Sequence, residues 1–196
     1  LGHELVSGTV KESRLQRWIR EIEQHPEAIL YCFRGGLRSQ TTQRWLQERG
    51  VSRPLIEGGY KAVRRFLIET LEEKSKHLQF EVVSGPTGSG KTQFLKQSGR
   101  PFLDLENLAC HRGSAFGMTK QAQPSQIDFE NELALALLRL GDQTSPVLIE
   151  NESRMIGQRV LPESLFRRMK ESPKLLLETP FEQRVVALFL VPFSWL

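Results

Sequence analysis

The chain has 196 residues, of which 39% are hydrophobic and 26% charged, and its formal net charge is +4. This balance excludes a disordered chain, and the length allows one large domain or two small ones. Two cysteines exclude a disulfide framework and suit a reducing, cytoplasmic setting. No apolar run is long enough for a spanning helix, so we expect no membrane partner, whereas the mild positive charge permits a polyanionic one.

The first part of the chain alternates helices with short strands. Apolar residues at helical spacing predict an amphipathic helix, and these are Leu15, Trp18, Ile19 and Ile22. The other segments are read from apolar runs and their glycine boundaries. In chain order we expect helix 11–24, strand 28–33, helix 38–50, strand 53–59 and helix 60–73. Strands that alternate with helices predict a parallel α/β layout.

A second α/β series follows the polar segment "EEKSKHLQ", residues 72–79, which we interpret as a linker. The expected strands are 80–84, 102–105, 146–150 and 174–178, and the expected helices are 90–98, 126–140 and 162–171. This division predicts two domains, 1–78 and 79–196. The chain starts without methionine and ends in the apolar tail "VVALFLVPFSWL", so we also expect a piece of a longer protein.

The sequence "GPTGSGKT", residues 85–92, fits the phosphate-binding pattern G-x-x-x-x-G-K-[ST] between an apolar strand and a helix. Glycines let the backbone curl so that its N–H groups face phosphate oxygens, and the helix adds its positive end. Lys91 would reach the terminal phosphates and Thr92 would ligate Mg²⁺. The expected phosphate-binding residues are Gly85, Gly88, Ser89, Gly90, Lys91 and Thr92. Whether ATP binds stays open, because any diphosphate ester satisfies such a loop.

A second acid normally completes a phosphate site of this kind at the end of a neighbouring strand. The stretch "FLDLEN" offers Asp104 and Glu106, and "PVLIENES" offers Glu150 and Glu152. Our candidates are Asp104, Glu150 and Glu152. Each could equally be a solvated carboxylate at a strand end. No spacing of residues typical of a dedicated protein metal site is present, so we expect none beyond Mg²⁺ with phosphate.

Cys32 stands where the strand 28–33 meets a glycine-rich loop, in "YCFRGGLRSQ". The helix N-terminus and the arginines of this loop would lower the thiol pKa and favour the thiolate. The loop residues that would hold an anion are Arg34, Gly35, Gly36 and Arg38. Two chemistries fit: transfer of sulfur or selenium, and phosphatase chemistry with the arginine of C-x5-R on the phosphate. A buried structural cysteine is the third reading.

Other polar groups are weaker candidates. His111 and Arg112 lie in the glycine-rich stretch "CHRGSAFG", which is either a substrate or tRNA contact or an ordinary turn. Arg154 is either a phosphate clamp or part of a structural ion pair. Basic side chains that could meet RNA phosphates are Lys61, Arg64, Arg65, Arg167, Arg168 and Lys170.

Six stretches resemble, in order, the signature blocks of the tRNA 2-selenouridine synthase family. They are "YCFRGGLRSQ", "PLIEGGYKAVRRFLI", "SGPTGSGKT", "DLENLACHRGSAFG", "QPSQIDFEN" and "ENESRMIG". The resemblance implies the fold class: a partial rhodanese-like domain followed by a P-loop NTPase-like parallel α/β domain. Cys32 matches the family's essential cysteine, and residues 85–92 match its P-loop. Because the family's rhodanese-like domain begins upstream of Leu1, activity of this chain alone stays open.

The resemblance also implies a reaction. Sulfur in the wobble 2-thiouridine of tRNA would be replaced by selenium from selenophosphate, through an S-geranyl intermediate made from geranyl diphosphate. Alkylation would let the sulfur leave as a neutral thiol. A selenophosphate-producing enzyme is a further expected partner. Two alternatives stay open: a cysteine-dependent phosphatase or sulfurtransferase fused to an ATP-binding kinase-like domain, and a tRNA-binding remnant without chemistry.

Overall fold

The computed structural model describes residues 7–111 and 122–184. The chain divides into two compact units, Leu1–Phe66 and Leu67–Leu196. The division falls inside helix α3 (Gly59–His77), whereas the predicted domain boundary after residue 78 coincides with the end of that helix. Within the two described ranges, no helix is both long enough and apolar enough to cross a membrane.

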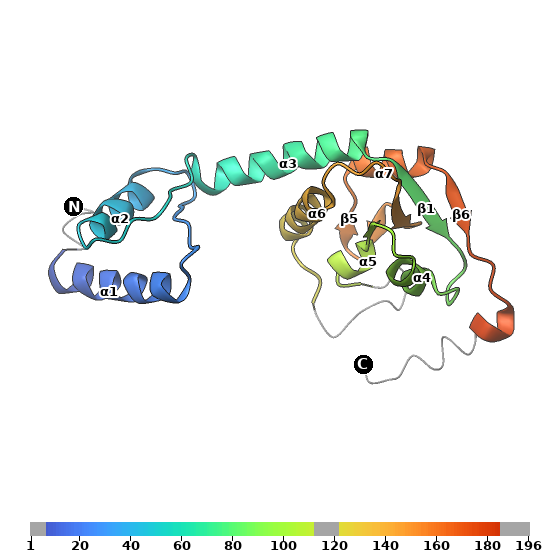
Figure 1. Ribbon diagram of the computed structural model, residues 1–196, viewed down its shortest axis with the longest axis horizontal. Helices are drawn as coiled ribbons and strands as arrows, with labels where there is room; N and C mark the ends of the chain where they lie inside the picture. Colours follow the sequence, from blue (N-terminus) through green and yellow to red (C-terminus); the bar gives the residue numbers. More distant parts are fainter. Residues whose placement is uncertain (1–6, 112–121, 185–196) are drawn as a thin grey trace. The chain divides into compact units, whose positions relative to one another are not determined.

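The first unit holds helices α1 (Gly8–Gln24) and α2 (Leu37–Gln47) and the start of α3 (Figure 1). Its core is small, because among the described residues only Leu15, Ile22 and Leu46 are buried in it. Partly buried side chains complete this core, namely Trp18, Ile19, Ala28, Leu30, Trp45 and Val51. The apolar positions that predicted the first helix therefore face this core, and that helix begins three residues earlier than expected.

The prediction of two extended strands in this unit is wrong. Segments 28–33 and 53–59 meet in one parallel bridge between Leu30 and Leu55. A strand needs a neighbour along its whole length, and here each segment has only the other among the described residues. The side chains of Ile29, Tyr31 and Phe33 are consequently more than half exposed.

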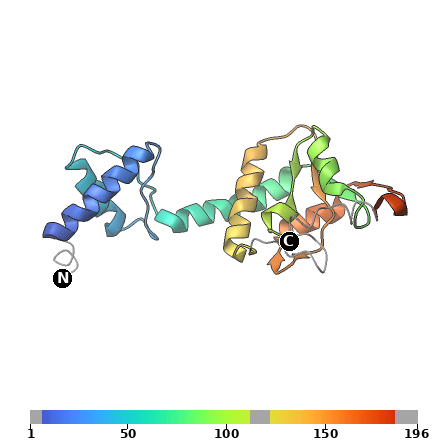
Figure 2. The same ribbon diagram turned by 90° about the horizontal axis from the view of Figure 1, so that it is seen from below.

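The second unit is built on a parallel four-stranded sheet, which confirms the predicted α/β layout (Figure 2). The strand order is β2-β3-β1-β6. The strands are β1 (Phe80–Ser84), β2 (Phe102–Leu103), β3 (Val147–Glu150) and β6 (Lys174–Leu176). In register, Phe80 pairs with Val147 and Val83 pairs with Glu150, so β1 and β3 end side by side. Both strands are almost fully buried, as expected for central parallel strands.

Besides the end of α3 and a helical turn at 181–184, four helices and a hairpin accompany the sheet among the described residues. The helices are α4 (Lys91–Gln97), α5 (Leu105–Leu108), α6 (Gln126–Leu140) and α7 (Glu163–Glu171). The hairpin joins β4 (Met155–Ile156) to β5 (Arg159–Val160) in antiparallel register, and it was not predicted. Helix α6 starts where the Ser125 hydroxyl accepts a hydrogen bond from the Asp128 N–H. Its buried face consists of Phe129, Leu133, Ala134 and Leu137.

The polar segment 72–79 is mostly helical. Helix α3 continues to His77, and carboxylates lie one turn before cations on its surface. Glu72 pairs with Lys76 at 3.6 Å, and Glu73 pairs with His77 at 3.4 Å. Such i,i+4 pairs support an exposed helix, and basic groups in the last turn favour the negative end of the helix dipole. A strongly polar segment such as residues 72–77 can therefore be helical.

Candidate functional site

The glycine-rich loop 85–92 joins the carboxyl end of β1 to helix α4. Gly88 and Gly90 have φ angles of +80° and +82°, in the left-handed region that glycine adopts without strain. A Cβ at Gly85 would lie 2.5 Å from the Ser89 hydroxyl and 3.0 Å from the Leu177 carbonyl oxygen. The Lys91 ammonium donates to the carbonyl of Gly85 at 3.0 Å. The lysine side chain is thus folded back onto the loop that would bind the phosphates.

Glu150 ends β3 directly beside this loop. The Thr92 hydroxyl donates to Glu150 Oε1 at 2.7 Å, and this glutamate has no exposed surface. Its second oxygen, Oε2, is buried without a hydrogen-bond partner among the described residues. Burial raises the pKa of Glu150, the Thr92 hydrogen bond lowers it, and the charges of Glu106, Asp104 and Glu152 raise it, so that the net pKa is about 7.

Three carboxylates gather at this point. Glu106, Glu150 and Glu152 each place an oxygen within 4.8 Å of the others. Burial first, and then the charge of Glu106, raises the pKa of Glu152 to about 7, while Lys91 lowers it. Because mutually repelling carboxylates with an orphaned buried oxygen are stabilised by a cation, this oxygen-rich set fits Mg²⁺.

Asp104 and Glu106 have different places in the structure. Asp104 caps α5, where its carboxylate accepts from the Asn107 N–H at 2.9 Å, and it lies 3.9 Å from the Lys96 ammonium. The single turn of α5 then directs Glu106 toward the other two glutamates. The sequence offered both acids, but only the helical turn after Asp104 distinguishes the capping residue from the one that joins the cluster.

In the first unit, Cys32 faces the N-terminal turn of α2. The Ser39 hydroxyl lies 3.2 Å from the Cys32 sulfur and also 3.1 Å from the Gly36 carbonyl oxygen. The thiol itself is 3.9 Å from that same carbonyl. Ser39 is buried, and the sequence did not single it out as a site residue. Its position at the third residue of a helix, directly after Arg38, is the signal that could have indicated it.

The pKa of the Cys32 thiol is lowered from 9.0 to about 6. The hydrogen bond from Ser39 is the largest cause, followed after an opposing desolvation effect by backbone hydrogen bonds from Arg34, Ser39 and Gly36. The lowered pKa was predicted from the arginine charges and the helix end. The backbone hydrogen bonds from Gly36 and Ser39 belong to that helix end, whereas the largest cause is the Ser39 hydroxyl and the exposed Arg34 acts through its backbone.

The cysteine loop is held against the start of α3. The N–H of Tyr60 donates to the Cys32 carbonyl at 2.9 Å, and the N–H of Lys61 donates to the Phe33 carbonyl at 3.1 Å. Gly59 has a φ of +60°, and a Cβ there would collide with the carbonyl oxygen of Cys32 and the backbone nitrogen of Gly35. The glycines of the stretch "EGGY" are therefore required so that two backbones can approach closely.

Comparison with known proteins identifies the family. Residues 78–190 match the family model described as "tRNA 2-selenouridine synthase AAA domain". This chain belongs to that family. The resemblance seen in the sequence is thereby confirmed, and the parallel sheet with its glycine-rich loop is compatible with an AAA domain of the P-loop type.

Curated relatives carry the same description. The chain is 53% identical over 186 residues to a tRNA 2-selenouridine synthase of Marinobacter nauticus, and these cover 94% of this chain and 50% of that protein. It is 51% identical over 193 residues to one of Nitrosomonas europaea, covering 96% of this chain and 50% of the relative. The chain spans about half the length of the curated relatives it matches. No solved structure matches it.

Two glutamines of the family block "QPSQIDFEN" hold the β4–β5 hairpin in place. The Gln123 amide donates to the carbonyls of Ala109 and Ile156 at 3.0 and 3.1 Å and accepts from the Gln158 N–H at 2.8 Å. The Gln126 amide donates to the Val160 carbonyl at 2.8 Å and accepts from its N–H at 3.0 Å. This hairpin begins three residues after Glu152, so the two glutamines anchor the segment that follows this carboxylate.

Two of the remaining candidates, His111 and Arg154, lie near this hairpin. His111 Nδ1 is buried without a hydrogen-bond partner among the described residues. Arg112 lies outside the described residues. Arg154 pairs with Glu163 at 3.0 Å, and both side chains are more than half exposed. The structure therefore places Arg154 in an ion pair at the start of α7.

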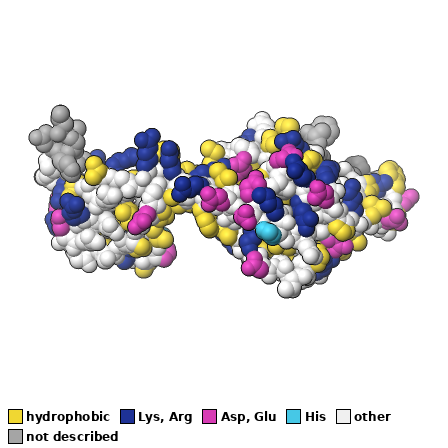
Figure 3. Space-filling view, turned by 90° about the horizontal axis from the view of Figure 1, so that it is seen from above, with side chains coloured by type: hydrophobic (Ala, Val, Ile, Leu, Met, Phe, Trp, Pro, Cys, Tyr) yellow, Lys and Arg dark blue, Asp and Glu magenta, His cyan; other side chains and the backbone are white. Residues whose placement is uncertain are grey.

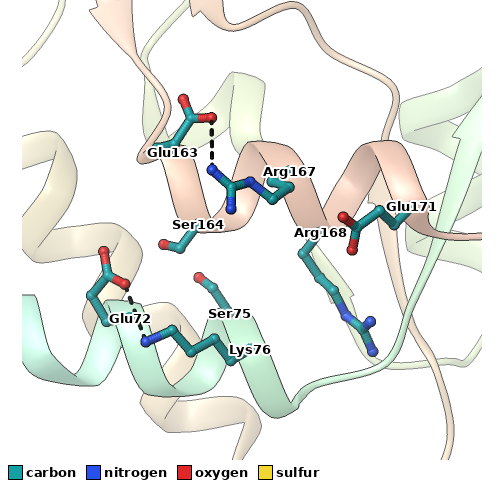
Figure 4. Close-up of a pocket in the computed structure, with 8 residues that line it drawn as sticks. All are labelled: Glu72, Ser75, Lys76, Glu163, Ser164, Arg167, Arg168 and Glu171. Carbon is teal, nitrogen blue, oxygen red and sulfur yellow. Dashed lines mark ion pairs between the residues drawn. The ribbon is translucent and has the colours of Figure 1, made fainter.

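A separate hollow lies between α3 and α7, with a volume of about 330 Å³ (Figure 4). Its lining contains as many acidic as basic side chains, and it consists of Glu72, Ser75, Lys76, Glu163, Ser164, Arg167, Arg168 and Glu171. Arg168 donates to the Leu78 carbonyl at 3.2 Å, and Arg167 lies 3.7 Å from Glu163. With these charges balanced, the hollow does not favour the RNA phosphates predicted for Arg167 and Arg168.

Proposed function

We propose that this chain works in a tRNA-modifying transferase that replaces the sulfur of wobble 2-thiouridine by selenium. The relatives are named for 2-selenouridine synthesis on tRNA, and this name supports the reaction class. One observation carries the proposal: this member of the family contains two anion sites of different construction. One is a low-pKa thiol in the Cys32 loop, and the other is the P-loop with its buried glutamates.

The P-loop would hold the diphosphate of geranyl diphosphate. The sulfur of 2-thiouridine attacks the first carbon of the geranyl chain, the carbon–oxygen bond breaks, and diphosphate leaves. Lys91, released from the Gly85 carbonyl, would neutralise charge on the departing phosphate. The Thr92 hydroxyl and the Glu150 carboxylate would hold Mg²⁺, which supplies further charge neutralisation when bound. The orphaned Glu150 oxygen supports this assignment.

The Cys32 loop would serve the selenium step, within what we propose to be part of a rhodanese-like domain. Once alkylated, the sulfur leaves the base as the neutral geranyl thiol, with a proton from selenophosphate, while selenium bonds to the ring carbon in its place. Water then cleaves the phosphorus–selenium bond and phosphate is released. The backbone N–H groups at Arg34, Gly36 and Ser39, which already stabilise the thiolate, provide donors for an anionic selenium group. An enzyme that makes selenophosphate would be the supplying partner, in the same reducing cytoplasm.

A cysteine-dependent phosphatase is the second candidate, and one observation favours it. Cys32 and Arg38 have the C-x5-R spacing, and the residue that follows, Ser39, donates to the cysteine sulfur. A thiolate so stabilised would attack the phosphorus of a phosphate ester, and the alcohol would leave. Hydrolysis of an aryl phosphate by the wild type, lost in Cys32→Ser, would support this alternative.

The test uses the protein at its full encoded length. It is incubated with an anticodon stem-loop containing 2-thiouridine, geranyl diphosphate and selenophosphate, and the nucleosides are read by mass spectrometry. We expect the wild type to produce a selenium-for-sulfur mass shift and Cys32→Ser to produce none. Lys91→Ala should also produce none, because the prenylated nucleoside does not form in this variant. Glu171→Gln, a change in the separate hollow, is the matched control. Absence of any modified nucleoside would overturn the proposal.

A further inference from the structure

An aromatic side chain stands exposed next to the reactive thiol. Phe33 follows Cys32 directly, and half of its ring surface, 51%, is open to solvent. The ring of Tyr60 is stacked with it at a centroid distance of 6.2 Å and an interplanar angle of 24°. The Lys61 ammonium lies 5.7 Å from the Phe33 ring centroid. Single exposed rings are common on protein surfaces, but this one directly follows the reactive cysteine and has a cation near its face.

The position of this ring is fixed by the backbone. The Tyr60 and Lys61 N–H groups donate to the carbonyls of Cys32 and Phe33, so the two residue pairs lie side by side. Gly59 allows this approach, because any side chain there would meet the Cys32 carbonyl. The ring therefore belongs to the residue next to Cys32, and the backbone that carries it is held by the same contacts that shape the cysteine loop.

The surroundings of the ring are cationic. Arg34, Arg38, Lys61 and Arg65 are all exposed, and Lys61 and Arg65 share one face of α3 because they are four residues apart. Glu57, in the turn before α3, and Glu69, four residues after Arg65, are the acids nearest to Lys61 and Arg65 in sequence. Figure 3 shows several Lys and Arg side chains gathered on the first unit near the beginning of this helix. An aromatic face among cations is the arrangement that binds unpaired nucleotides, through base stacking and phosphate contacts.

We propose that Phe33, supported by Tyr60, is the platform on which an unpaired base of the RNA substrate stacks next to Cys32. Lys61 and the loop arginines then contact the flanking phosphates. This inference rests on the proposed function, and it names the residues that would bring the wobble base to the thiolate. Stacking tolerates any base, so this platform would position the nucleotide without identifying it.

The experiment compares Phe33→Leu, Phe33→Tyr and Phe66→Leu in the protein at its full encoded length. Phe66 is a matched control, since its ring is 54% exposed in the same unit. Binding is measured with two anticodon stem-loops, one with 2-thiouridine at the wobble position and one abasic there. We expect Phe33→Leu to weaken binding of the first RNA about tenfold, a typical loss for one stacked base. Phe33→Tyr and Phe66→Leu should bind like the wild type.

With the abasic RNA, the wild type and Phe33→Leu should bind equally. An equal loss with both RNAs, or no loss with either, overturns the inference. A third result would also overturn the inference: Phe33→Leu lowers the unfolding temperature but leaves binding per folded molecule unchanged. The ring would then stabilise the fold and not the RNA complex. The selenium-for-sulfur assay separates the two proposals. If the base stacks on Phe33 but no selenation occurs, the stacking inference is supported and the proposed function is overturned. If selenation occurs without stacking on Phe33, the proposed function is supported and the stacking inference is overturned.

Discussion

The hydroxyl of Ser39 lies 3.2 Å from the sulfur of Cys32 and donates to it from the first turn of α2. This one contact is the largest cause of the lowered cysteine pKa, which falls to about 6. The thiol is therefore mostly ionised at neutral pH. Ser39 makes the thiolate available without any charged partner in contact with the sulfur.

Removal of this hydroxyl should make the thiol less reactive. In Ser39→Ala we expect the pKa of Cys32 to rise and the rate of alkylation by iodoacetamide at pH 6 to fall by roughly three- to tenfold, because the thiolate is the reacting form. The rate is measured against pH, with Cys32→Ser giving the background from Cys110. Ser52→Ala, an exposed serine of the same unit, is the control. An unchanged pH profile in Ser39→Ala would remove Ser39 from this role.

The approach of two backbones at Gly59 predicts an unusually damaging alanine substitution. Gly59→Ala forces a Cβ onto the Cys32 carbonyl at a φ of +60°, whereas Gly50→Ala meets no atom within 4 Å at a φ of +76°. Gly50→Ala should cost only the strain of the left-handed conformation, about 1 kcal/mol. We expect Gly59→Ala to cost more than twice as much and to change Cys32 reactivity, as measured by urea unfolding and alkylation. Equal costs for the two variants would contradict this account of the turn.

The buried glutamates predict how the stability of the second unit depends on pH. The pKa of Glu150 is raised from 4.5 to about 7, so between these values the folded state keeps a proton that the unfolded state has lost. Unfolding free energy should then fall as pH rises through this range, by on the order of 3 kcal/mol for such a shift. Denaturant unfolding with EDTA present would measure this. Glu150→Gln should flatten the slope, and a wild-type stability that rises over this range would refute the assignment.

The same carboxylates predict binding of a divalent cation. We expect Mn²⁺, followed by titration calorimetry, to bind the wild type more tightly as pH rises through about 7, because carboxylate ligands must be deprotonated. Glu150→Gln and Thr92→Val should weaken this binding at least tenfold, the usual size of a lost ligand or its support. Glu171→Gln, at the unrelated hollow, should bind like the wild type. Binding that survives Glu150→Gln would place the cation elsewhere.

The glutamine tether predicts a local effect on the hairpin. Gln123→Leu removes three hydrogen bonds that join the hairpin to the end of α5. We expect backbone amides of β4 and β5 to exchange with solvent faster, with a loss of stability of about 1 kcal/mol per hydrogen bond at most. Hydrogen exchange read by mass spectrometry tests this. Protection of the hairpin equal to that of the wild type would show that the tether is dispensable.

The sequence predicted the second unit more closely than the first. Strand 80–84 and helix 126–140 agree with the structure residue for residue, because buried apolar runs and the helical spacing around Phe129 leave little choice. Strands 28–33 and 53–59 failed because apolar character predicts burial, and pairing depends on neighbours that are distant in the chain. The hairpin β4–β5 was missed because its pairing depends on side chains of Gln123 and Gln126, far from it in sequence.

The candidate sites divide in the same way. The loop 85–92 is local, so its pattern alone locates it. Ser39 and Glu106 act across space, and only the turns of α2 and α5 bring them to Cys32 and Glu150. No periodicity in the sequence distinguishes them from other polar residues at helix starts.

We propose that the P-loop prepares the leaving group and that the Cys32 loop serves the selenium step. To test this division, the Lys91→Ala protein at its full encoded length is incubated with selenophosphate and a stem-loop that already contains S-geranyl-2-thiouridine. The rate at which 2-selenouridine forms is then measured. We expect 2-selenouridine to form at the wild-type rate, while Lys91→Ala remains inactive on plain 2-thiouridine and Cys32→Ser remains inactive on both. Failure of Lys91→Ala on the geranylated RNA would contradict the division, because the P-loop would then be needed for the selenium step itself.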